Sequence, residues 1–514
     1  MAEQGPAGYT VDQALEAIGY GKFHAKVFLY VMLGSVGEAM ELMLLTYVGL
    51  ATKADFKLTS SEENLISIVT YIGIIFGAWL WSAVSDSFGR KPGFLGAAIV
   101  TSVAGCLSCL AHNYMTLMVF RGIVGFGLGG AHVFTTWGME FVPRFKTGIL
   151  TIALFACCSI GTCLEALLAW LIVPTFGWRV LFGVSSLPSL LVLVFYKFVP
   201  ESPIYLYSKG KLEDAIKVLM EGATLNGKAL PEGSLIPENI PVAATATNES
   251  SLTEPLITDI SSSGGDETSE ERGENNAQQA QPGRLSAMLH LLTTWIRTTV
   301  IRWIKTKFFP CIKSSFLRIK MLLSATWYRK TILLWLLYFM NTYSYSGIIH
   351  LTSELNSQDI TDRGFYKNVF VISFAEFPGL CLAAWTMQNL GRKLAMVNML
   401  FMGFLLFLVQ TIDQCQTIMT SVFATRMVMS GCFVAIQMYT EEVYPTPLRT
   451  TAVGIAIIVG RIGSIVWPLA PAATGADDTR KTPAMIMFTL KIFVSFVSVL
   501  MLPVETRLEE LEDP

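Results

Sequence analysis

The sequence Val84-Ser-Asp-Ser-Phe-Gly-Arg-Lys91 is a short charged stretch between two long apolar segments. Arg90 and Lys91 cannot lie in the hydrocarbon of a bilayer, so they mark a membrane boundary, and short loops rich in Lys and Arg face the cytosol. Gly89 permits the tight turn that such a loop needs. A weaker copy, Met387-Gln-Asn-Leu-Gly-Arg-Lys393, recurs in the second half of the chain. Two copies so far apart indicate a duplicated membrane protein.

The composition also points to a membrane protein. Of the 514 residues, 52% are hydrophobic and 15% are charged, whereas about a quarter of a soluble protein is charged. The apolar residues gather in segments of about 20 residues, which is the length that crosses a bilayer as a helix. No nucleophile–base constellation, metal motif or nucleotide-binding loop stands out. We therefore expect no enzyme activity, no metal or cofactor, and no nucleic-acid partner.

Twelve apolar spans divide the chain into two halves. We expect an all-α membrane protein with twelve transmembrane helices in two six-helix bundles. In chain order the expected parts are a cytosolic N-terminal segment at 1–26, the first bundle at 27–199, a cytosolic insertion at 200–330, the second bundle at 331–502 and a cytosolic tail at 503–514. Basic residues fall on one side of this arrangement, so both termini are expected in the cytosol.

The insertion changes character along its length. Residues 241–282 are rich in Ser, Thr, Glu, Gln and Gly and cannot bury a core, so we expect disorder there. Residues 285–330 alternate Leu, Ile, Trp and Phe with Arg and Lys. This pattern favours basic amphipathic helices that lie on the anionic cytosolic leaflet. The alternative is a solvated basic linker.

Several motifs agree in order and spacing with one family. They are the Gly-Arg-Lys loop, Arg121 followed by Gly125, Gly127 and Gly129, the Pro-Glu-Ser-Pro run at 200–203, and Glu441-Glu-Val-Tyr-Pro445. Together they resemble the major facilitator superfamily of transporters. Glu38-Ala-Met-Glu41 and Phe374-Ala-Glu-Phe-Pro-Gly379 are similar to the organic cation/carnitine transporter 7 type of plants, which is close to nicotinate transporters and synaptic vesicle 2-related proteins. The resemblance implies alternating access about a midplane site.

The prediction of proton coupling rests on acidic residues that lie inside apolar spans. An ionisable group in the membrane costs about 2.5–3.5 kcal/mol, so it persists where it faces a water-filled cavity or a partner. Glu38 and Glu41 are three residues apart and share one helix face, and such carboxyls can exchange protons. Arg121 and Glu165 are the further candidates. Arg121 could pair with Glu165 or with an acid of the first span, and a structural pair and a proton relay look alike in the sequence.

Arg461 is the residue most informative about the substrate. It lies in Gly460-Arg-Ile-Gly-Ser-Ile465, which is similar to the eleventh helix of organic anion transporters, where the arginine meets the anion. A guanidinium binds a carboxylate through two parallel hydrogen bonds, and Gly463 would leave room for the ligand. The alternative is an ion pair with Glu376 or another buried acid.

Further polar and aromatic residues complete the expected pocket. With Arg461 they are Glu38, Glu41, Trp137, Asn341, Tyr343, Tyr345, Phe374 and Gln437. Aromatic rings can stack on a flat acid or hold a quaternary ammonium; the alternative is that they only pack. A further set of charged residues is expected to form gates: Asp86, Arg90, Glu140, Arg144, Glu376, Arg392, Glu441 and Arg449.

The sequence thus predicts a secondary transporter of a small carboxylate-bearing solute, with nicotinate as the first choice and proton coupling. One alternative is a carnitine or organic cation transporter, and another is a non-transporting receptor or scaffold. We expect a monomer in the plasma membrane, with the vacuolar membrane as the alternative. Anionic lipids are the expected partners of residues 285–330.

Overall fold

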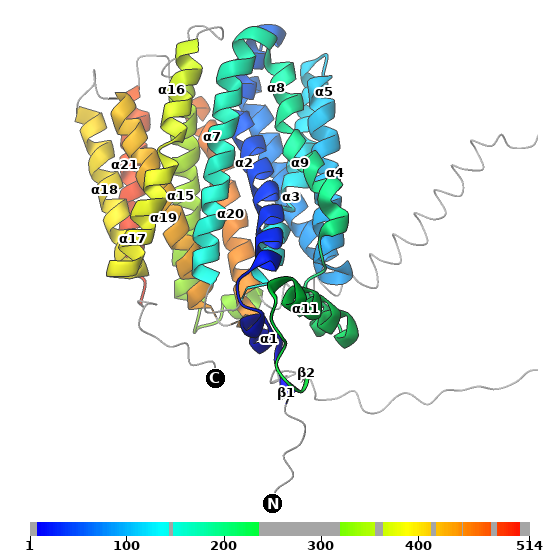
Figure 1. The fold of residues 1–514 in the computed structure, drawn as a ribbon. Helices are drawn as coiled ribbons and strands as arrows, with labels where there is room; N and C mark the ends of the chain where they lie inside the picture. Colours follow the sequence, from blue (N-terminus) through cyan, green and yellow to red (C-terminus); the bar gives the residue numbers. More distant parts are fainter. Residues whose placement is uncertain are drawn as a thin grey trace, which may run out of the picture. The chain divides into compact units, whose positions relative to one another are not determined.

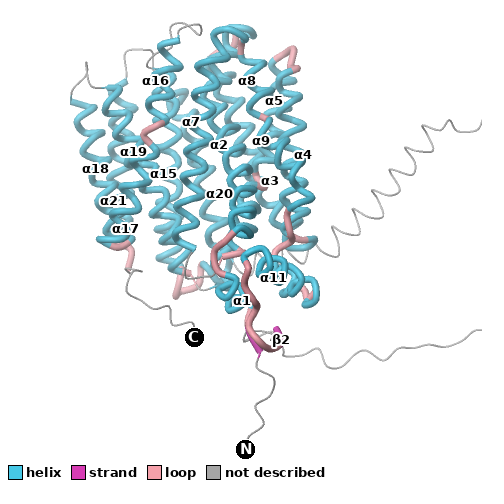
Figure 2. The backbone as a smooth tube through the Cα atoms, viewed as in Figure 1, coloured by secondary structure: helices cyan, strands magenta, loops and turns pink. Residues whose placement is uncertain are grey.

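The computed structural model describes residues 8–142, 147–235, 319–354, 363–412, 418–444, 446–473 and 481–503. Its long helices run side by side (Figure 1, Figure 2). Arg144 lies outside the described residues, as do the predicted disordered stretch at 241–282 and most of the basic segment at 285–330. Arg449 lies on a helix, but its side chain is outside the described part.

The first half of the chain folds into long helices, two of which are broken. In order they are α2 (Lys22–Phe56), α3 (Ser60–Phe88), α4 (Arg90–Cys109), α5 (Tyr114–Leu128) with α6 (Ala131–Met139), α7 (Thr147–Phe176), and α8 (Trp178–Ser185) with α9 (Leu187–Phe195), followed by the short 3-10 helix Tyr196–Phe198. Side chains cap their free N–H groups. The Asn113 side chain accepts the N–H of Thr116 at 2.8 Å where α5 begins, and Thr59 forms a capping box with Glu62 at α3.

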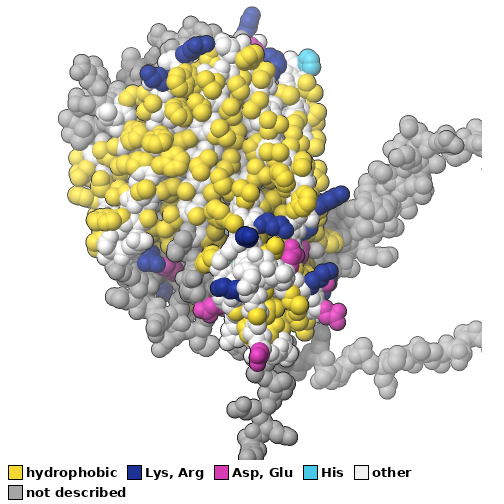
Figure 3. All heavy atoms as spheres, in the orientation of Figure 1, with side chains coloured by type: hydrophobic (Ala, Val, Ile, Leu, Met, Phe, Trp, Pro, Cys, Tyr) yellow, Lys and Arg dark blue, Asp and Glu magenta, His cyan; other side chains and the backbone are white. Residues whose placement is uncertain are grey.

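The second half repeats this arrangement. Its helices are α15 (Tyr328–Glu354), α16 (Arg363–Ser373) with α17 (Glu376–Leu390), α18 (Arg392–Ile412), α19 (Ile418–Val443), α20 (Thr446–Ala473) and α21 (Lys481–Leu500). Within the described ranges, nine helical spans are long and apolar enough to cross a membrane. Figure 3 shows hydrophobic side chains covering a broad band, with charged side chains gathered at its two ends.

A small subdomain lies at one end of the helices. The strand β1 (Gly8–Tyr9) pairs in parallel with β2 (Ser234–Leu235), and α1 (Val11–Ile18), α10 (Pro203–Ser208) and α11 (Leu212–Asn226) lie beside them. The all-α prediction missed these two short strands. The Asn226 side chain accepts the N–H of Phe23 at 3.0 Å and donates to the carbonyl of Gly19 at 2.9 Å. We call this end of the molecule the α11 end.

Glycines on α5 bring the neighbouring helices close. A Cβ added at Gly125 would lie 2.1 Å from the carbonyl oxygen of Thr70 on α3, and one added at Gly127 would lie 2.2 Å from Oγ1 of Thr101 on α4. Real Cβ atoms do not approach so closely, so only glycine fits these contacts. Because Arg121 precedes Gly125 by one turn, the same contacts fix its position.

The two halves meet along a seam. On this seam α3 packs against α20, and α7 packs against α16. The Asn64 side chain donates to the carbonyl of Pro468 at 3.3 Å. At the end opposite α11, the ring of Tyr366 on α16 lies 5.9 Å from that of Tyr47 on α2 within one buried apolar cluster. The helix after α16 starts at Glu376, two residues before Pro378, which cannot continue the hydrogen-bond ladder.

Replacing Gly125 by valine is expected to destabilise the protein. The added side chain would force α3 and α5 apart, and overpacking of this kind costs about 1–3 kcal/mol. Thermal unfolding of the detergent-solubilised protein measures the effect. Gly183→Val is the matched control, because a Cβ there meets nothing within 4 Å. Equal unfolding temperatures for the two variants would contradict the close packing of α5.

Candidate functional site

An ion pair is buried inside the first half. Nη1 of Arg121 on α5 lies 3.0 Å from Oε2 of Glu41 on α2, and both side chains have no exposed surface. The guanidinium also lies over the ring of Phe182 at 5.6 Å. Of the two partners that the sequence leaves open for Arg121, the structure therefore places the first-span acid beside it. Two charges so deeply buried persist only as a pair, because removal of either leaves the other uncompensated.

A second buried pair lies in the other half. Nη2 and Nε of Arg426 on α19 lie 2.8 and 3.2 Å from Oε1 of Glu376, which begins α17. The Tyr345 hydroxyl on α15 donates to the same oxygen at 2.5 Å. Sequence reasoning missed Arg426, although an arginine in the apolar stretch Ala-Thr-Arg-Met-Val is as unusual as Arg121. Glu376 was expected at a gate; the structure buries its carboxyl against Arg426, and a gate role for it stays a prediction.

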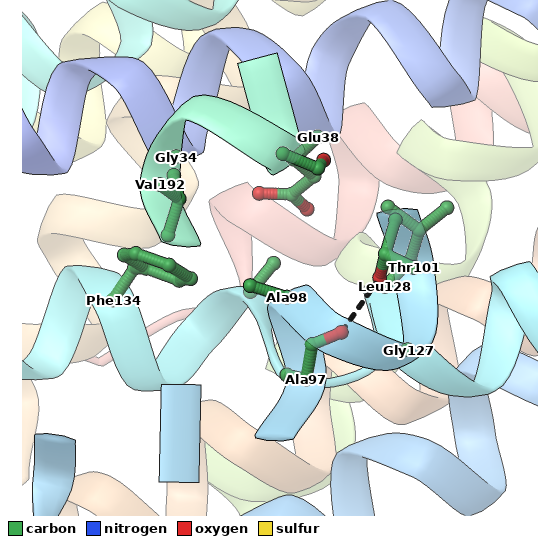
Figure 4. A pocket seen from close by; sticks show the side chains of 11 residues that line it. Gly34, Glu38, Ala97, Ala98, Thr101, Gly127, Leu128, Phe134 and Val192 are labelled. Carbon is green, nitrogen blue, oxygen red and sulfur yellow. Dashed lines mark hydrogen bonds between the residues drawn. The ribbon is translucent and has the colours of Figure 1, made fainter. Parts of the chain in front are cut away.

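A third, looser pair joins the two halves. Nη2 of Arg461 on α20 lies 3.8 Å from Oε1 of Glu38 on α2, and each side chain is 22% exposed. Glu38 also borders a cavity of about 30 Å³ inside the first half. Figure 4 shows its carboxyl turned toward Ala98 and Phe134 on the cavity wall. Of the three pairs, this is the longest and the most exposed.

Glu165 on α7 is a buried acid of a different kind. Its side chain has no exposed surface, and both carboxyl oxygens lie 2.8 Å from the hydroxyl of Ser185 on α8. Within the described part of the chain no Lys, Arg or His nitrogen lies within ion-pair distance of this carboxyl. An ionised carboxylate held only by a hydroxyl is costly in an apolar interior. Of the acids in this region, Glu165 is therefore the one whose burial is most costly when its carboxyl group carries no proton.

We call these seven residues the seam cluster: Glu38, Glu41, Glu165, Glu376, Arg121, Arg426 and Arg461. It contains one carboxyl group more than it has guanidinium groups. The seam cluster thus carries an excess of acids in the first half and an excess of arginines in the second.

The residues expected in the pocket make different contacts. Trp137 is fully buried and donates to the carbonyl of Pro200 at 3.2 Å, so it belongs to the core of the first half and not to a pocket wall. Tyr343 packs against Trp467, and its ring lies 3.0 Å from Nζ of Lys491 on α21. Gln437 donates to Glu441 at 3.2 Å. The roles of Tyr343 and Gln437 in a pocket with Arg461 stay predictions.

The remaining pocket predictions have mixed outcomes. Asn341 on α15 is 2% exposed, and its amide finds no hydrogen-bond partner among the described residues. Phe374 lies at the α16–α17 break, is 53% exposed and packs on Phe377. Gly463 does not make room for a ligand, because a Cβ there would lie 2.5 Å from the carbonyl oxygen of Phe339 on α15. This glycine instead brings α20 against α15.

The charged loop after α3 forms a compact cluster at the α11 end. Nε and Nη2 of Arg90 lie 3.0 and 2.9 Å from Oε1 of Glu140, and Nη1 lies 2.5 Å from Oδ1 of Asp86. Glu201, which sequence reasoning did not single out, accepts the N–H of Arg90 at 3.1 Å and that of Lys91 at 3.2 Å. Burial raises the pKa of the Glu201 carboxyl, and these hydrogen bonds act in the opposite direction. Gly89, with φ +123°, turns the chain here.

The second half carries the matching pair. Nε and Nη2 of Arg392 lie 3.0 Å from Oε1 of Glu442. Arg392 and Glu442 are separated by 50 residues in the chain, as Arg90 and Glu140 are. Glu442, the neighbour of the predicted gate residue Glu441, meets Arg392 here. The duplication inferred from the two loops thus extends to their acidic partners.

The comparisons with known proteins agree along the whole chain. The sequence profile of the family described as "Sugar (and other) transporter" matches residues 24–260. The "Organic cation/carnitine transporter 7" of Arabidopsis thaliana is 36% identical over 526 residues, which cover 99% of this chain and 97% of that protein. The "Niacin transporter NiaP" of Acinetobacter baylyi is 25% identical, with 97% of this chain and 98% of that protein covered.

A solved structure shares the fold. The xylose transporter XylE from E. coli, in a partially occluded inward-open conformation, superposes with a TM-score of 0.64 at 16% identity. The superposition covers 96% of this chain and all of that one. At this identity the likeness concerns the arrangement of the helices alone.

Loss of one partner of the pair between Arg121 and Glu41 is expected to destabilise the fold strongly. Arg121→Gln leaves a buried carboxyl uncompensated, which costs about 3–5 kcal/mol. Glu41→Gln combined with Arg121→Gln removes both charges and should recover most of that loss. Thermal unfolding in detergent compares the variants. Arg179→Gln is the control, because its ion pair with Asp55 is exposed and such pairs contribute at most about 1 kcal/mol.

Proposed function

This chain belongs to the major facilitator superfamily and is a membrane transporter rather than an enzyme, and we propose that it carries a small organic solute with a carboxylate group, nicotinate first, together with a proton. The observation that carries the proposal is the loose pair between Arg461 and Glu38, which joins the two halves. Sites near the membrane midplane, between two halves that rock against each other, are the basis of alternating access.

Arg461 is the proposed anion site. Its guanidinium is partly exposed, and its distance of 3.8 Å from Glu38 is longer than that of a charge-assisted hydrogen bond. The other two arginines of the seam cluster are fully buried and hold acids at 3.0 and 2.8 Å. A solute carboxylate therefore displaces Glu38 more easily than it displaces Glu41 or Glu376. The relative named as a niacin transporter supports an aromatic acid as the solute.

Proton coupling follows from the same pair. When a solute carboxylate takes Arg461, an ionised Glu38 loses its partner and faces a second anion. Protonation of Glu38 removes this repulsion, so that one anion and one proton enter together and the charge of the site does not change. The cavity beside Glu38, of about 30 Å³, has room for one water molecule that could deliver the proton.

We further propose that the α11 end faces the cytosol. Lys22, Arg90, Lys91, Arg392 and Lys393 lie where helices begin at that end, and basic residues collect on the cytosolic side. The plasma membrane, a monomeric state and anionic lipids as partners of residues 285–330 belong to the same proposal.

A carnitine or organic cation transporter is the second candidate. The relative that is 36% identical carries this name. In that case Glu38, rather than Arg461, would hold the charged group of the solute, and the partly exposed Tyr345 could provide an aromatic face.

Uptake of labelled nicotinate into cells that express the protein tests the anion site. Removal of the guanidinium in Arg461→Ala is expected to raise KM at least tenfold, a loss of about 1.4 kcal/mol or more. Arg179→Ala, at an exposed arginine on α8, is the matched control and should behave as the wild type. Nicotinate uptake that survives in Arg461→Ala, or carnitine uptake in its place, would favour the cation transporter.

The pH dependence of uptake tests the role of Glu38. A lower external pH protonates Glu38 and frees Arg461, so wild-type nicotinate uptake should rise. Glu38→Gln imitates the protonated side chain permanently, so uptake should persist but lose its rise at low pH and its ability to concentrate the solute. Glu213→Gln on the exposed start of α11 serves as the control. An unchanged pH profile in Glu38→Gln would exclude this residue as the coupling site.

A further inference from the structure

The contact between Glu165 on α7 and Ser185 on α8 brings together more oxygen atoms than one hydrogen can bridge. Oγ of Ser185 lies 2.8 Å from each carboxyl oxygen of Glu165 and 2.8 Å from the carbonyl oxygen of Leu181, one turn earlier on α8. A hydroxyl group has a single hydrogen to donate, whereas an ionised carboxylate and a carbonyl can only accept. With Glu165 ionised, one hydrogen would have to serve three contacts between oxygen atoms.

A proton on Glu165 completes this hydrogen-bond arrangement. The carboxylic acid then donates its O–H to Oγ of Ser185, and Ser185 donates its own hydrogen to the carbonyl of Leu181. Serine side chains form such bonds to the preceding turn of a helix. Each hydrogen then has one acceptor, and the Ser185 hydroxyl both accepts and donates, as its chemistry allows.

The surroundings of this contact also favour the neutral acid. Neither Glu165 nor Ser185 has exposed surface, so bulk water does not stabilise a charge there. The titratable groups that face Glu165 are Glu41 and Tyr47 from α2 and Arg121 from α5. Arg121 is already bound to Glu41 at 3.0 Å, so this pair adds little net positive charge. Within the described part of the chain, an ionised Glu165 would therefore be buried without a cation bound to it.

The contact lies at the break between α8 and α9. Ser185 is the last residue of α8, and Pro188 in the first turn of α9 has no N–H to donate to α8. Beyond the break, a Cβ added at Gly37 of α2 would lie 3.2 Å from Cβ of Pro188 and 3.3 Å from Oγ of Ser189. Ser189 also lines the cavity beside Glu38. The bond at Ser185 therefore fixes one side of a break whose other side borders Glu38.

We propose that Glu165 is a second proton-binding site, which in this conformation carries a proton, donates it to Ser185 and so holds the break between α8 and α9 against α7. This proton is distinct from the one that enters with the solute at Glu38. Its loss would leave contacts between oxygen atoms without a hydrogen and would loosen the break. The site rests on the proposed function only for the role of Glu38.

The pH dependence of thermal stability tests whether Glu165 carries a proton. An unfolded chain releases the proton of a glutamic acid near the ordinary pKa of about 4.3, whereas the native wild type has to keep it. Rising pH therefore destabilises the wild type in a way that it does not destabilise Glu165→Gln. The difference between their unfolding temperatures in detergent should shift in favour of Glu165→Gln from about pH 5 to about pH 8.

Glu213→Gln, on the exposed start of α11, is the matched control. Its unfolding temperature should keep a constant difference from that of the wild type over the same pH range. A constant difference for Glu165→Gln as well would mean that Glu165 is ionised in the native protein, and would overturn the proposal.

Infrared spectroscopy of the purified full-length protein detects the proton directly, because a carboxylic acid and a carboxylate absorb at separate frequencies. At neutral pH, the spectrum of the wild type minus that of Glu165→Gln should contain the C=O band of one carboxylic acid. Ser185→Ala removes the acceptor, so this band should move to a higher frequency. Ser208→Ala, at an exposed serine of α10, is the control and should leave the band in place. A carboxylate band in the difference spectrum would contradict the proposal.

Neither measurement needs a solute, so the outcomes separate this site from the transport proposal. A protein that contains the protonated Glu165 but carries no nicotinate would contradict the proposed solute and leave the site intact. A protein that carries nicotinate with the expected pH dependence but holds an ionised Glu165 would overturn the site and leave the proposed function intact.

Discussion

The contact between Glu38 and Arg461 joins the two halves through charges that neither half can compensate alone. In the first half, Arg121 is already engaged by Glu41, and among the described residues Glu38 forms no ion pair with a cation of its own half. In the second half, Glu376 is already engaged by Arg426, and within the same described ranges Arg461 forms no ion pair with an acid of its own half. Glu38 and Arg461 therefore face each other across the seam. A charge in a membrane protein must face a partner or water, and this contact between the halves gives both residues a partner.

Close backbone contacts set the positions of these charges. A Cβ at Gly379 on α17 would lie 2.2 Å from the carbonyl oxygen of Met427 on α19. This contact places Glu376, one turn earlier on α17, opposite Arg426, the neighbour of Met427. Gly125 does the same for Arg121 on α5. Small residues at helix contacts therefore do more than pack, because they bring the few buried charges within hydrogen-bond distance.

The two halves have matching ion pairs at the α11 end, but their buried ion pairs join different helices. The pairs of Arg90 with Glu140 and of Arg392 with Glu442 have the same spacing and geometry. Inside, Arg121 pairs with the first long helix of its half, whereas Arg426 pairs with the second. This asymmetry leaves excess acid in the first half and excess arginine in the second.

The sequence alone determined the membrane fold, the duplication, the family and the identity of most buried charges, because hydropathy, Gly-rich spacing and an ionisable residue in an apolar span are local signals. Arg426 carries the same local signal, an arginine in an apolar span, but it belongs to none of the family motifs. The partners of these charges were decided by the tertiary structure. Trp137 has the residue type of a pocket, but the rotation of its helix buries it in the packing of the first half. Pairing depends on which helix faces meet at the seam, and contacts between residues hundreds of positions apart leave no trace in one sequence.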